Sequence, residues 1–586
     1  MSRLALWLTL GAMLAGCTGS IGETNGTRSG GPSATGTATG AGGSSVGSGS
    51  TGSGGSTVDM PPPPGDKPPS AEITCPSTTT ETVGHRALRR LTNAELETTI
   101  RATFNLTATQ WPGVNLPSDA ASLDGFTNNV DSLTVGADYA SGTLDGGKKI
   151  GTLVSTDPLL TQLLPCATKG DAACADTFVT TFGAKLYRRP LTAAEKARYI
   201  ALYNKVIAAQ SDFKSFVYWA TMTMLQSPSV IYRSEIGAPD VASRFKLTPY
   251  EVATELAYTF SGGPPAADLL QLAATNQLST PDQVEAAART LVFNGQAVKP
   301  AFRDIVLQFS DQWLGLTGLS NLKKDAMAFP DFTSQIQDSM GEETRRFLSS
   351  VIFDDRGSVK SLLTAPYTFV DPTLAKYYGY GAATGVDFVR ADRPATAGVG
   401  LLAQGSLLAV QANGLSTSPT RRGHLVRTRM LCTVVPPPGI VVGPIPPPSA
   451  ANTTRQRYED LHAVNPTCKA CHSMMDQIGF ALEHLDGAGR YRALEGTFAI
   501  DDTGTVTATS AGDLKVKGAT ELATAISSLP EVNNCVASYL AAYALGVSHD
   551  SAACLVSTAT AELRGGTSLL DFYVRMARSE HFRSRQ

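Results

Sequence analysis

The stretch LTPYEVATELAYTF, residues 247–260, begins with the signals of a helix start. Thr248 suits the N-cap position, and Glu251, three residues later, completes a capping box in which each residue binds the other's backbone N–H. Pro249 falls at the first helical position, where its missing N–H removes no helical hydrogen bond. The apolar residues that follow, as far as Phe260, recur at helical spacing. This stretch therefore predicts a helix that begins at the proline.

The same pattern of cap and acidic partner occurs twice more. Thr92 is followed by Glu95, and Thr192 is followed by Glu195. Each pair leads into apolar residues of helical period. Three later helices are expected on the same ground, at residues 282–291, 301–314 and 332–353.

Strand-like sequence is scarce. Polar and apolar residues alternate most clearly over residues 497–509, which predicts a strand. The fold class is therefore predicted to be mainly α: a multi-helical body, then a small helical C-terminal domain with a β-hairpin insertion. Trp313, within one of the expected helices, is predicted to lie in the core.

The N-terminus has the composition of an export signal. A weakly basic start precedes an apolar run over residues 4–14, which is too short to span a bilayer, a distance of about 20 helical residues. The sequence LAGC at residues 14–17 resembles the lipobox of bacterial lipoproteins. Residues 1–16 are then a signal peptide, and Cys17 carries the lipid. Thr18 favours the outer membrane. The alternative is an ordinary signal peptide with an incidental cysteine.

Residues 17–75 contain mostly Gly, Ser, Thr and Pro. Such a segment buries too little apolar surface to offset its ordering entropy, so we expect a disordered tether between the lipid and the folded body. A second proline-rich stretch, with three prolines at 436–438 and three at 446–448, is expected to be extended and stiff. It predicts a domain boundary near residue 450.

Composition excludes one class of partner. The chain of 586 residues has a net charge of -3, a pI near 6.2 and a mean hydropathy of -0.04. Its length allows two to four domains. Because a nucleic-acid-binding surface requires a basic excess, nucleic acid is not an expected partner.

An exported protein matures in an oxidising compartment, which affects how its cysteines pair. There are nine cysteines, and Cys17, Cys468 and Cys471 have other expected roles. Six cysteines remain, which allow fifteen connectivities. Proximity in sequence favours Cys166–Cys174 and Cys535–Cys554, and it leaves Cys75–Cys432 by elimination.

The sequence CKACH, residues 468–472, has the spacing of a c-type haem attachment motif. Cys468 and Cys471 are separated by one helical turn, so both thiols reach one edge of a porphyrin, and His472 follows to reach the iron. One haem c is therefore the predicted cofactor, with His472 as the proximal ligand.

Three other interpretations of the motif remain open. The two cysteines form a disulfide, either structural or redox-active, in the first. In the second they bind zinc together with His472 and Cys432. In the third the thiols are incidental.

The second axial ligand is not determined by the sequence. Met475 lies on nearly the same helical face as His472, so it is predicted to pack against the ring edge or the core. His484 lies roughly 18 Å further along a continuous helix, which is too far. The remaining candidates come from other elements: His549, Met576 and His581. If none of them binds, the iron keeps an open position.

The N-terminal half of the folded chain contains the distinctive stretches Arg89-Arg90-Leu91-Thr92, Gly125-Phe126-Thr127-Asn128, Tyr187-Arg188-Arg189-Pro190, Leu225-Gln226-Ser227-Pro228 and Tyr232-Arg233-Ser234-Glu235. The C-terminal half contains Thr420-Arg421-Arg422-Gly423, the CKACH motif with Ser473 to Asp476, Gly479-Phe480-Ala481-Leu482-Glu483, and Tyr543-Ala544-Leu545-Gly546. In the order in which they stand, these stretches resemble a multi-module family of domains of unknown function found in planctomycetes and myxobacteria. Gln477 departs from the proline usual in the family, which concerns a turn more than chemistry.

The resemblance includes a cytochrome-c-like module and implies haem, but it implies no substrate. It supports division of the folded chain into helical modules at 84–165, 166–240 and 241–380, a connector at 381–450, and a cytochrome-c-like region at 451–586.

The leading hypothesis is a lipid-anchored envelope protein with one haem, which serves electron transfer with a redox partner protein or acts as the redox partner of an enzyme. The first alternative is a haem enzyme or sensor with an open iron. The second is a disulfide-stapled surface scaffold or binding protein without haem.

Overall fold

The computed structural model describes most of the chain from residue 83 onward: residues 83–86, 88–240, 244–381, 385–433, 435, 447–449, 451–463, 466–549, 551–552, 563 and 565–586. The predicted signal peptide and tether lie outside these residues. So do Cys17, Cys75, Cys554 and the prolines at 436–438.

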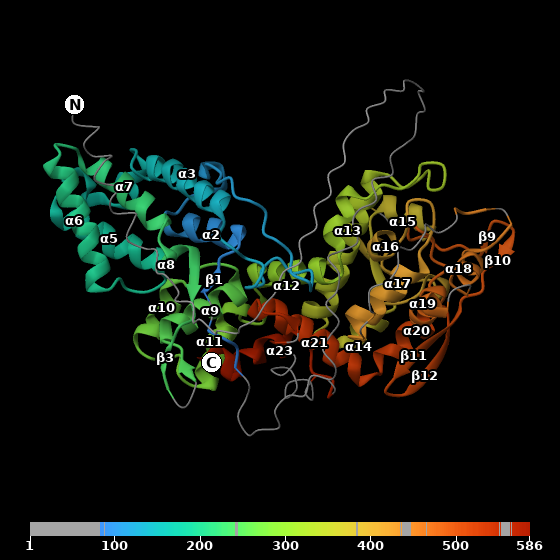
Figure 1. Cartoon of the computed structure of the whole chain (residues 1–586). Helices are drawn as coiled ribbons and strands as arrows, with labels where there is room; N and C mark the ends of the chain where they lie inside the picture. Colours follow the sequence, from blue (N-terminus) through green and yellow to red (C-terminus); the bar gives the residue numbers. More distant parts are fainter. Residues whose placement is uncertain are drawn as a thin grey trace, which may run out of the picture. The chain divides into compact units, whose positions relative to one another are not determined.

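The described body is mainly helical, as predicted (Figure 1). All three capping boxes are present, because the side chains of Thr92, Thr192 and Thr248 each accept the backbone N–H of the glutamate three residues later. The glutamate carboxylates bind the threonine N–H groups in return, at 2.8 Å. The sequence therefore predicted the N-cap residue of each of these three helices correctly.

The helices extend over most of the described chain. Those of the first two modules are α2 (Asn93–Thr103), α3 (Ala137–Val154), α4 (Leu159–Leu163), α5 (Ala172–Tyr187), α6 (Ala193–Ala208), α7 (Phe213–Leu225) and α8 (Pro228–Ile231). The next are α9 (Pro249–Ser261), α10 (Ala267–Ala274), α11 (Pro281–Val292), α12 (Pro300–Trp313), α13 (Ser334–Ser349), α14 (Val359–Thr364), α15 (Pro372–Tyr378) and α16 (Gly405–Val410). The last are α17 (Pro419–Leu425), α18 (Thr454–Ala463), α19 (Pro466–Phe480), α20 (Gly518–Ser527), α21 (Pro530–Leu545) and α23 (Leu569–Arg575).

The strands are short and pair in antiparallel fashion. They are β1 (Leu88–Arg90), β2 (Tyr232–Ser234), β3 (Ala238–Pro239), β4 (Phe245–Lys246), β5 (Phe293–Asn294), β6 (Ala297–Val298), β7 (Tyr367–Val370), β8 (Val389–Asp392), β9 (Leu494–Glu495), β10 (Phe498–Ala499), β11 (Thr503–Thr509), β12 (Gly512–Lys517) and β13 (Ser584–Arg585). The stretch predicted as strand at 497–509 contains β10 and β11. The hairpin is formed by β11 with β12.

The predicted helices at 282–291, 301–314 and 332–353 are confirmed as α11, α12 and α13, the last continued by a π-helical turn over Ser350–Asp354. Trp313 is 2% exposed, as expected of a core residue. One large hydrophobic core joins α9 and α12 to the C-terminal helices α21 and α23. Within it, the Tyr573 ring packs edge-on against Phe260 and Phe302 at 5.6 and 5.1 Å.

The two ends of the described body meet. Strand β13 pairs with β4, and the N–H of Gln586 donates to the Gly84 carbonyl at 3.0 Å. A buried ion cluster lies behind this contact: Arg585 binds Glu235, and Arg233 binds Glu255. Early, middle and late segments of the sequence therefore form one structure.

The disulfides confirm one predicted pair and correct the others. Cys166 and Cys174 are bonded, as proximity in sequence predicted. Cys535 is bonded to Cys432, with a Cα–Cα distance of 5.4 Å, so the predicted pairs Cys535–Cys554 and Cys75–Cys432 are wrong. The reason is tertiary packing, because Cys432 follows a π-helical turn, η8 (Val426–Met430), that packs against α21. Sequence separation, 103 residues here, contains no information about that contact.

Candidate functional site

Helix α19 carries the whole CKACH motif. Pro466 opens the helix, and Cys468, Cys471 and His472 follow within its first two turns. Cys468 and Cys471 are half-buried free thiols. Because residues three and four apart share a helical face, the two sulfurs and the imidazole project to the same side. The motif therefore lies in a helix, as its spacing requires, and haem attachment stays a prediction.

Helix α17 crosses α19 at backbone contact. A Cβ atom added to Gly423 of α17 would lie 1.9 Å from the Met475 carbonyl oxygen, and one added to Gly479 of α19 would lie 2.0 Å from the Pro419 oxygen. No side chain fits at either position, so both glycines are required for this close approach. Met475 is 5% exposed, in agreement with the prediction that it packs into the core.

The β-hairpin formed by β11 and β12 also packs against α19. A Cβ atom on Gly504 of β11 would lie 2.1 Å from the Gln477 carbonyl oxygen. Arg427, which is buried, donates from Nε to the Met474 carbonyl at 2.9 Å and from Nη1 to the Thr507 carbonyl at 2.6 Å. Helix α19 is therefore held between α17 and the hairpin, with little freedom to rotate.

His472 is oriented through one of its ring nitrogens. Its Nδ1 atom lies 3.3 Å from the Asp476 carboxylate, one helical turn later, and 3.4 Å from Thr420 Oγ1 of α17. Thr420 Oγ1 also donates to Asp476 Oδ1 at 2.5 Å. The His472 and Asp476 side chains are only 18% and 7% exposed. The imidazole is thus fixed by its own helix and by α17 together.

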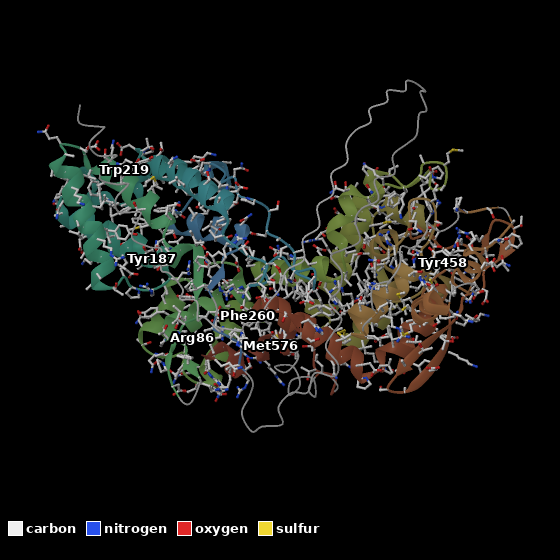
Figure 2. The ribbon with its side chains drawn as sticks, viewed as in Figure 1. Arg86, Tyr187, Trp219, Phe260, Tyr458 and Met576 are labelled. Carbon is white, nitrogen blue, oxygen red and sulfur yellow. A yellow bond between two sulfur atoms is a disulfide. The ribbon has the colours of Figure 1, made fainter. Side chains whose placement is uncertain are left out.

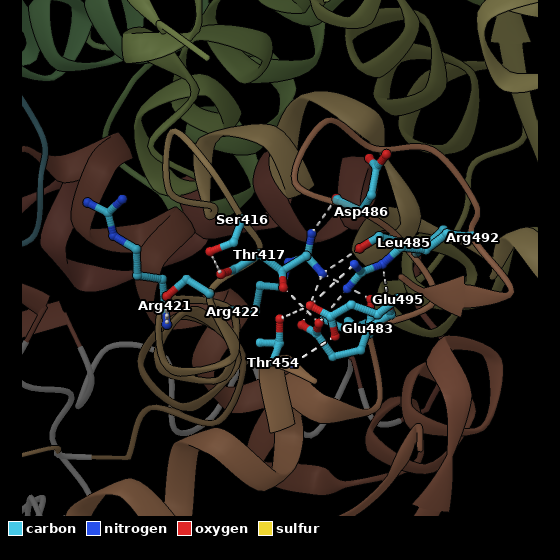
Figure 3. A network of polar contacts seen from close by, with 12 residues as sticks. Ser416, Thr417, Arg421, Arg422, Thr454, Glu483, Leu485, Asp486, Arg492 and Glu495 are labelled. Atoms are coloured by element: carbon cyan, nitrogen blue, oxygen red, sulfur yellow. Dashed lines mark hydrogen bonds and ion pairs between the residues drawn. The ribbon is translucent and has the colours of Figure 1, made fainter. Parts of the chain in front are cut away.

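A buried ionic network holds the end of α19 (Figure 3). Glu483, just beyond the helix, lies between the guanidinium groups of Arg422 and Arg492, at 3.7 and 2.8 Å. Thr417 also donates to Glu483, at 2.7 Å. Arg421, next to Arg422 in the sequence, points away from this network (Figure 3).

The network is deeply desolvated. Burial raises the pKa of the Glu483 carboxyl above its usual range, although both arginines oppose this. Burial also lowers the pKa of the Arg422 guanidinium to about 10. Arg422 further donates to the carbonyls of Leu482, Leu485 and Asp486 at 2.7–2.9 Å, which closes the turn after α19. Of the two adjacent arginines, Arg421 and Arg422, the second therefore has a structural role.

The structure places the three predicted distal-ligand residues in other surroundings. His549 Nε2 lies 2.6 Å from Ser538 Oγ and 3.2 Å from Cys432 Sγ. Met576 packs with α11 and α23, and its side chain is labelled in Figure 2. His581 is 2% exposed and accepts the Gly84 N–H at 3.2 Å. None of these contacts joins them to His472.

His484 lies beyond α19 and stabilises a local turn. Its Nδ1 atom donates to the Arg492 carbonyl at 2.8 Å, and its ring stacks on Tyr491 at 5.5 Å.

The donor atoms of the motif fit a c-type haem better than zinc. Both thiols are free, so the two cysteines are not joined in a disulfide. The zinc interpretation required Cys432 as a fourth ligand, and Cys432 is bonded to Cys535. Among the described residues, no group of three or more His, Cys, Asp or Glu side chains is arranged to hold a metal ion. Two thiols and one imidazole on one helical face are the groups that thioether attachment and axial ligation require.

The sequence did not identify Thr420 and Asp476 as parts of this site. Asp476 was detectable from spacing alone, since it stands four residues after His472 in a helix. Thr420 belongs to a different helix, more than fifty residues away, and only tertiary packing brings it to His472.

Four family models match the chain in succession. They are PSD3, a protein of unknown function (DUF1587), at residues 89–155; PSD5 (DUF1595) at 174–235; PSD4 (DUF1592) at 247–380; and PSCyt3 (DUF1588) at 398–495. The chain belongs to this planctomycete multi-module family. The PSCyt3 match covers α17, α19 and the ionic network, and relates that part of the chain to cytochrome-c-like modules. No curated protein and no solved structure matches the chain.

The module limits inferred from sequence stay predictions. The PSCyt3 match begins at residue 398 and runs past the boundary predicted near 450. The contact of α17 with α19 spans the same boundary. Over the residues that the structure describes, no helix has both the length and the apolar character needed to cross a membrane.

Proposed function

We propose that this protein carries one covalent haem c on helix α19 and uses it for one-electron transfer in the cell envelope. The observation that carries the proposal is the pair of free, half-buried thiols with His472 beside them, while Cys432 is engaged elsewhere. The family match supports it, because the matched module is cytochrome-c-like.

Each residue of the motif has a distinct role in this proposal. Cys468 and Cys471 would hold the haem as thioethers, each thiol adding across a vinyl group with sulfur on one carbon and the proton on the other, so that no oxidant would be consumed. His472 would hold the iron through Nε2, because Nδ1 faces Asp476. The bound group supplies a one-electron redox couple. The packing of α17 and the hairpin against α19 keeps these three side chains fixed during electron exchange.

The surrounding fold favours rapid exchange by limiting movement. A rigid helix at backbone contact with its neighbours changes little between oxidation states, which lowers the reorganisation that electron transfer requires. The Gly423 and Gly479 contacts and the Glu483 network provide that rigidity. The partner is expected to be a redox protein of the same compartment.

Cys17 would place the haem near a membrane in this proposal. Lipid on Cys17 would hold the chain at the outer membrane of the envelope, and residues 17–75 would separate the body from the surface. Fractionation tests this: the wild type is expected with membranes, and Cys17→Ser is expected in the soluble fraction. Equal membrane association of the two proteins would contradict the anchor.

A pyridine haemochrome spectrum tests the haem. The chain is produced with c-type maturation machinery, beside a Cys468→Ala/Cys471→Ala variant. A thioether-type α band is expected in the wild type and is expected to be lost in the variant. The matched control is Cys166→Ala/Cys174→Ala, which removes another closely spaced pair and is expected to keep the band. A folded but colourless wild type would overturn the proposal and favour a scaffold role.

A further inference from the structure

His472, Asp476 and Thr420 are joined to one another by polar contacts. The two carboxylate oxygens of Asp476 each lie 3.3 Å from His472 Nδ1, and Thr420 Oγ1 donates to one of them at 2.5 Å. Asp476 as a whole is 5% exposed. A carboxylate in this position can only accept, so it holds the proton of the imidazole on Nδ1.

Fixing the proton on Nδ1 has two consequences for an axial histidine. It leaves Nε2 as the atom with the lone pair directed to a metal, so it selects the ligating nitrogen. It also increases the electron density of the ring, because a negative charge stands behind the donor N–H. A more basic imidazole stabilises the higher charge of ferric iron relative to ferrous iron.

The position of the carboxylate is determined by two helices. Asp476 is one turn after His472 on α19, and Thr420 reaches it from α17. The backbone contact at Gly423 keeps α17 at that distance. The interaction is therefore part of the packing and not a mobile surface pair, and the low local exposure protects it from screening by water.

We infer that Asp476 is a positioning residue that orients His472 and lowers the reduction potential of the haem that His472 binds. The inference rests on the proposed function, and it adds the residue that tunes the reduction potential of the haem. A lowered potential suits a protein that donates electrons more readily than it accepts them.

Redox titration of the haem-loaded full chain tests this inference. Asp476→Asn keeps the shape and removes the charge, and we expect its ferrous form to gain at least tenfold relative to the ferric form. That ratio corresponds to an upward shift of 59 mV in a one-electron couple. The control is Asp501→Asn, which removes an equal charge from an exposed turn at the start of the hairpin and is expected to leave the potential unchanged.

Haem content, measured by haemochrome in every variant, separates the possible outcomes. A wild type without haem overturns the proposed function and the inference with it. If haem-loaded Asp476→Asn and Asp501→Asn have the same reduction potential, the inference is overturned but the proposed function is not. If Asp476→Asn does not fold, Thr420→Val serves instead, because it removes the anchor and leaves the charge. We expect a smaller shift in the same direction, and no shift there would also overturn the inference.

Discussion

Replacement of Gly423 by alanine tests whether the crossing of α17 and α19 is as close as described. The new Cβ atom would lie 1.9 Å from the Met475 carbonyl oxygen, whereas ordinary contact begins at 3.4 Å. The helices must therefore separate by about 1.5 Å, the difference between these distances. No rotamer change relieves the clash, because the opposing atom belongs to the backbone. Overpacking of this kind typically costs about 1–3 kcal/mol of unfolding free energy.

The separation also reaches the histidine. A shift of that size would lengthen the 2.5 Å bond from Thr420 to Asp476 beyond hydrogen-bonding distance. Denaturant unfolding of the full chain measures the stability, and a lowered midpoint at unchanged slope is expected. Gly341→Ala in α13 is the matched control, because its Cβ would lie 3.4 Å from the nearest atom, in the Leu319 side chain. Alanine there is expected to stabilise by up to about 1 kcal/mol. Equal stability of the two variants would refute the crossing.

Two further predictions concern stability. Loss of the Cys432–Cys535 disulfide is expected to lower the unfolding free energy by about 4.7 kcal/mol, and loss of Cys166–Cys174 by about 2.5 kcal/mol, because the closed loops differ in length. Denaturant unfolding of the two double-alanine variants measures both values. A reversed order would contradict the loop-entropy argument. Burial, reinforced by neighbouring arginines, lowers the pKa of Lys324 to about 7. Between pH 7 and 10, Lys324 therefore carries a proton in the unfolded chain but not in the folded chain. The unfolding free energy is therefore expected to rise with pH over that window in the wild type, and to rise less in Lys324→Met. Parallel pH profiles of the two proteins would show that Lys324 does not titrate this way.

The local features of the fold were predictable because they depend on neighbours in sequence. Thr248, Pro249 and Glu251 located a helix start, since a cap and its partner are three residues apart. The pairing of Cys166 with Cys174 was found for the same reason. Whatever depends on residues within one or two helical turns is available from the sequence.

The features that were missed depend on the packing of distant helices. The partner of Cys535 is set by the approach of η8 to α21, and no sequence pattern indicates that contact. Thr420 reaches His472 only because two glycines let α17 and α19 touch. The motif therefore supplied the proposed haem-binding residues, whereas the contacts of Thr420 with His472 and Asp476 required the tertiary structure.

The meeting of the two ends of the body has a consequence for how the modules are arranged. Gln586 exchanges backbone hydrogen bonds with Gly84 and Arg86, so the first and last segments share a sheet edge. The first and last described segments are thus neighbours in space, although they stand at opposite ends of the described chain. Because the two ends are neighbours, we expect a short linker from residue 586 to residue 84, with a new opening at an exposed loop, to be compatible with the same packing.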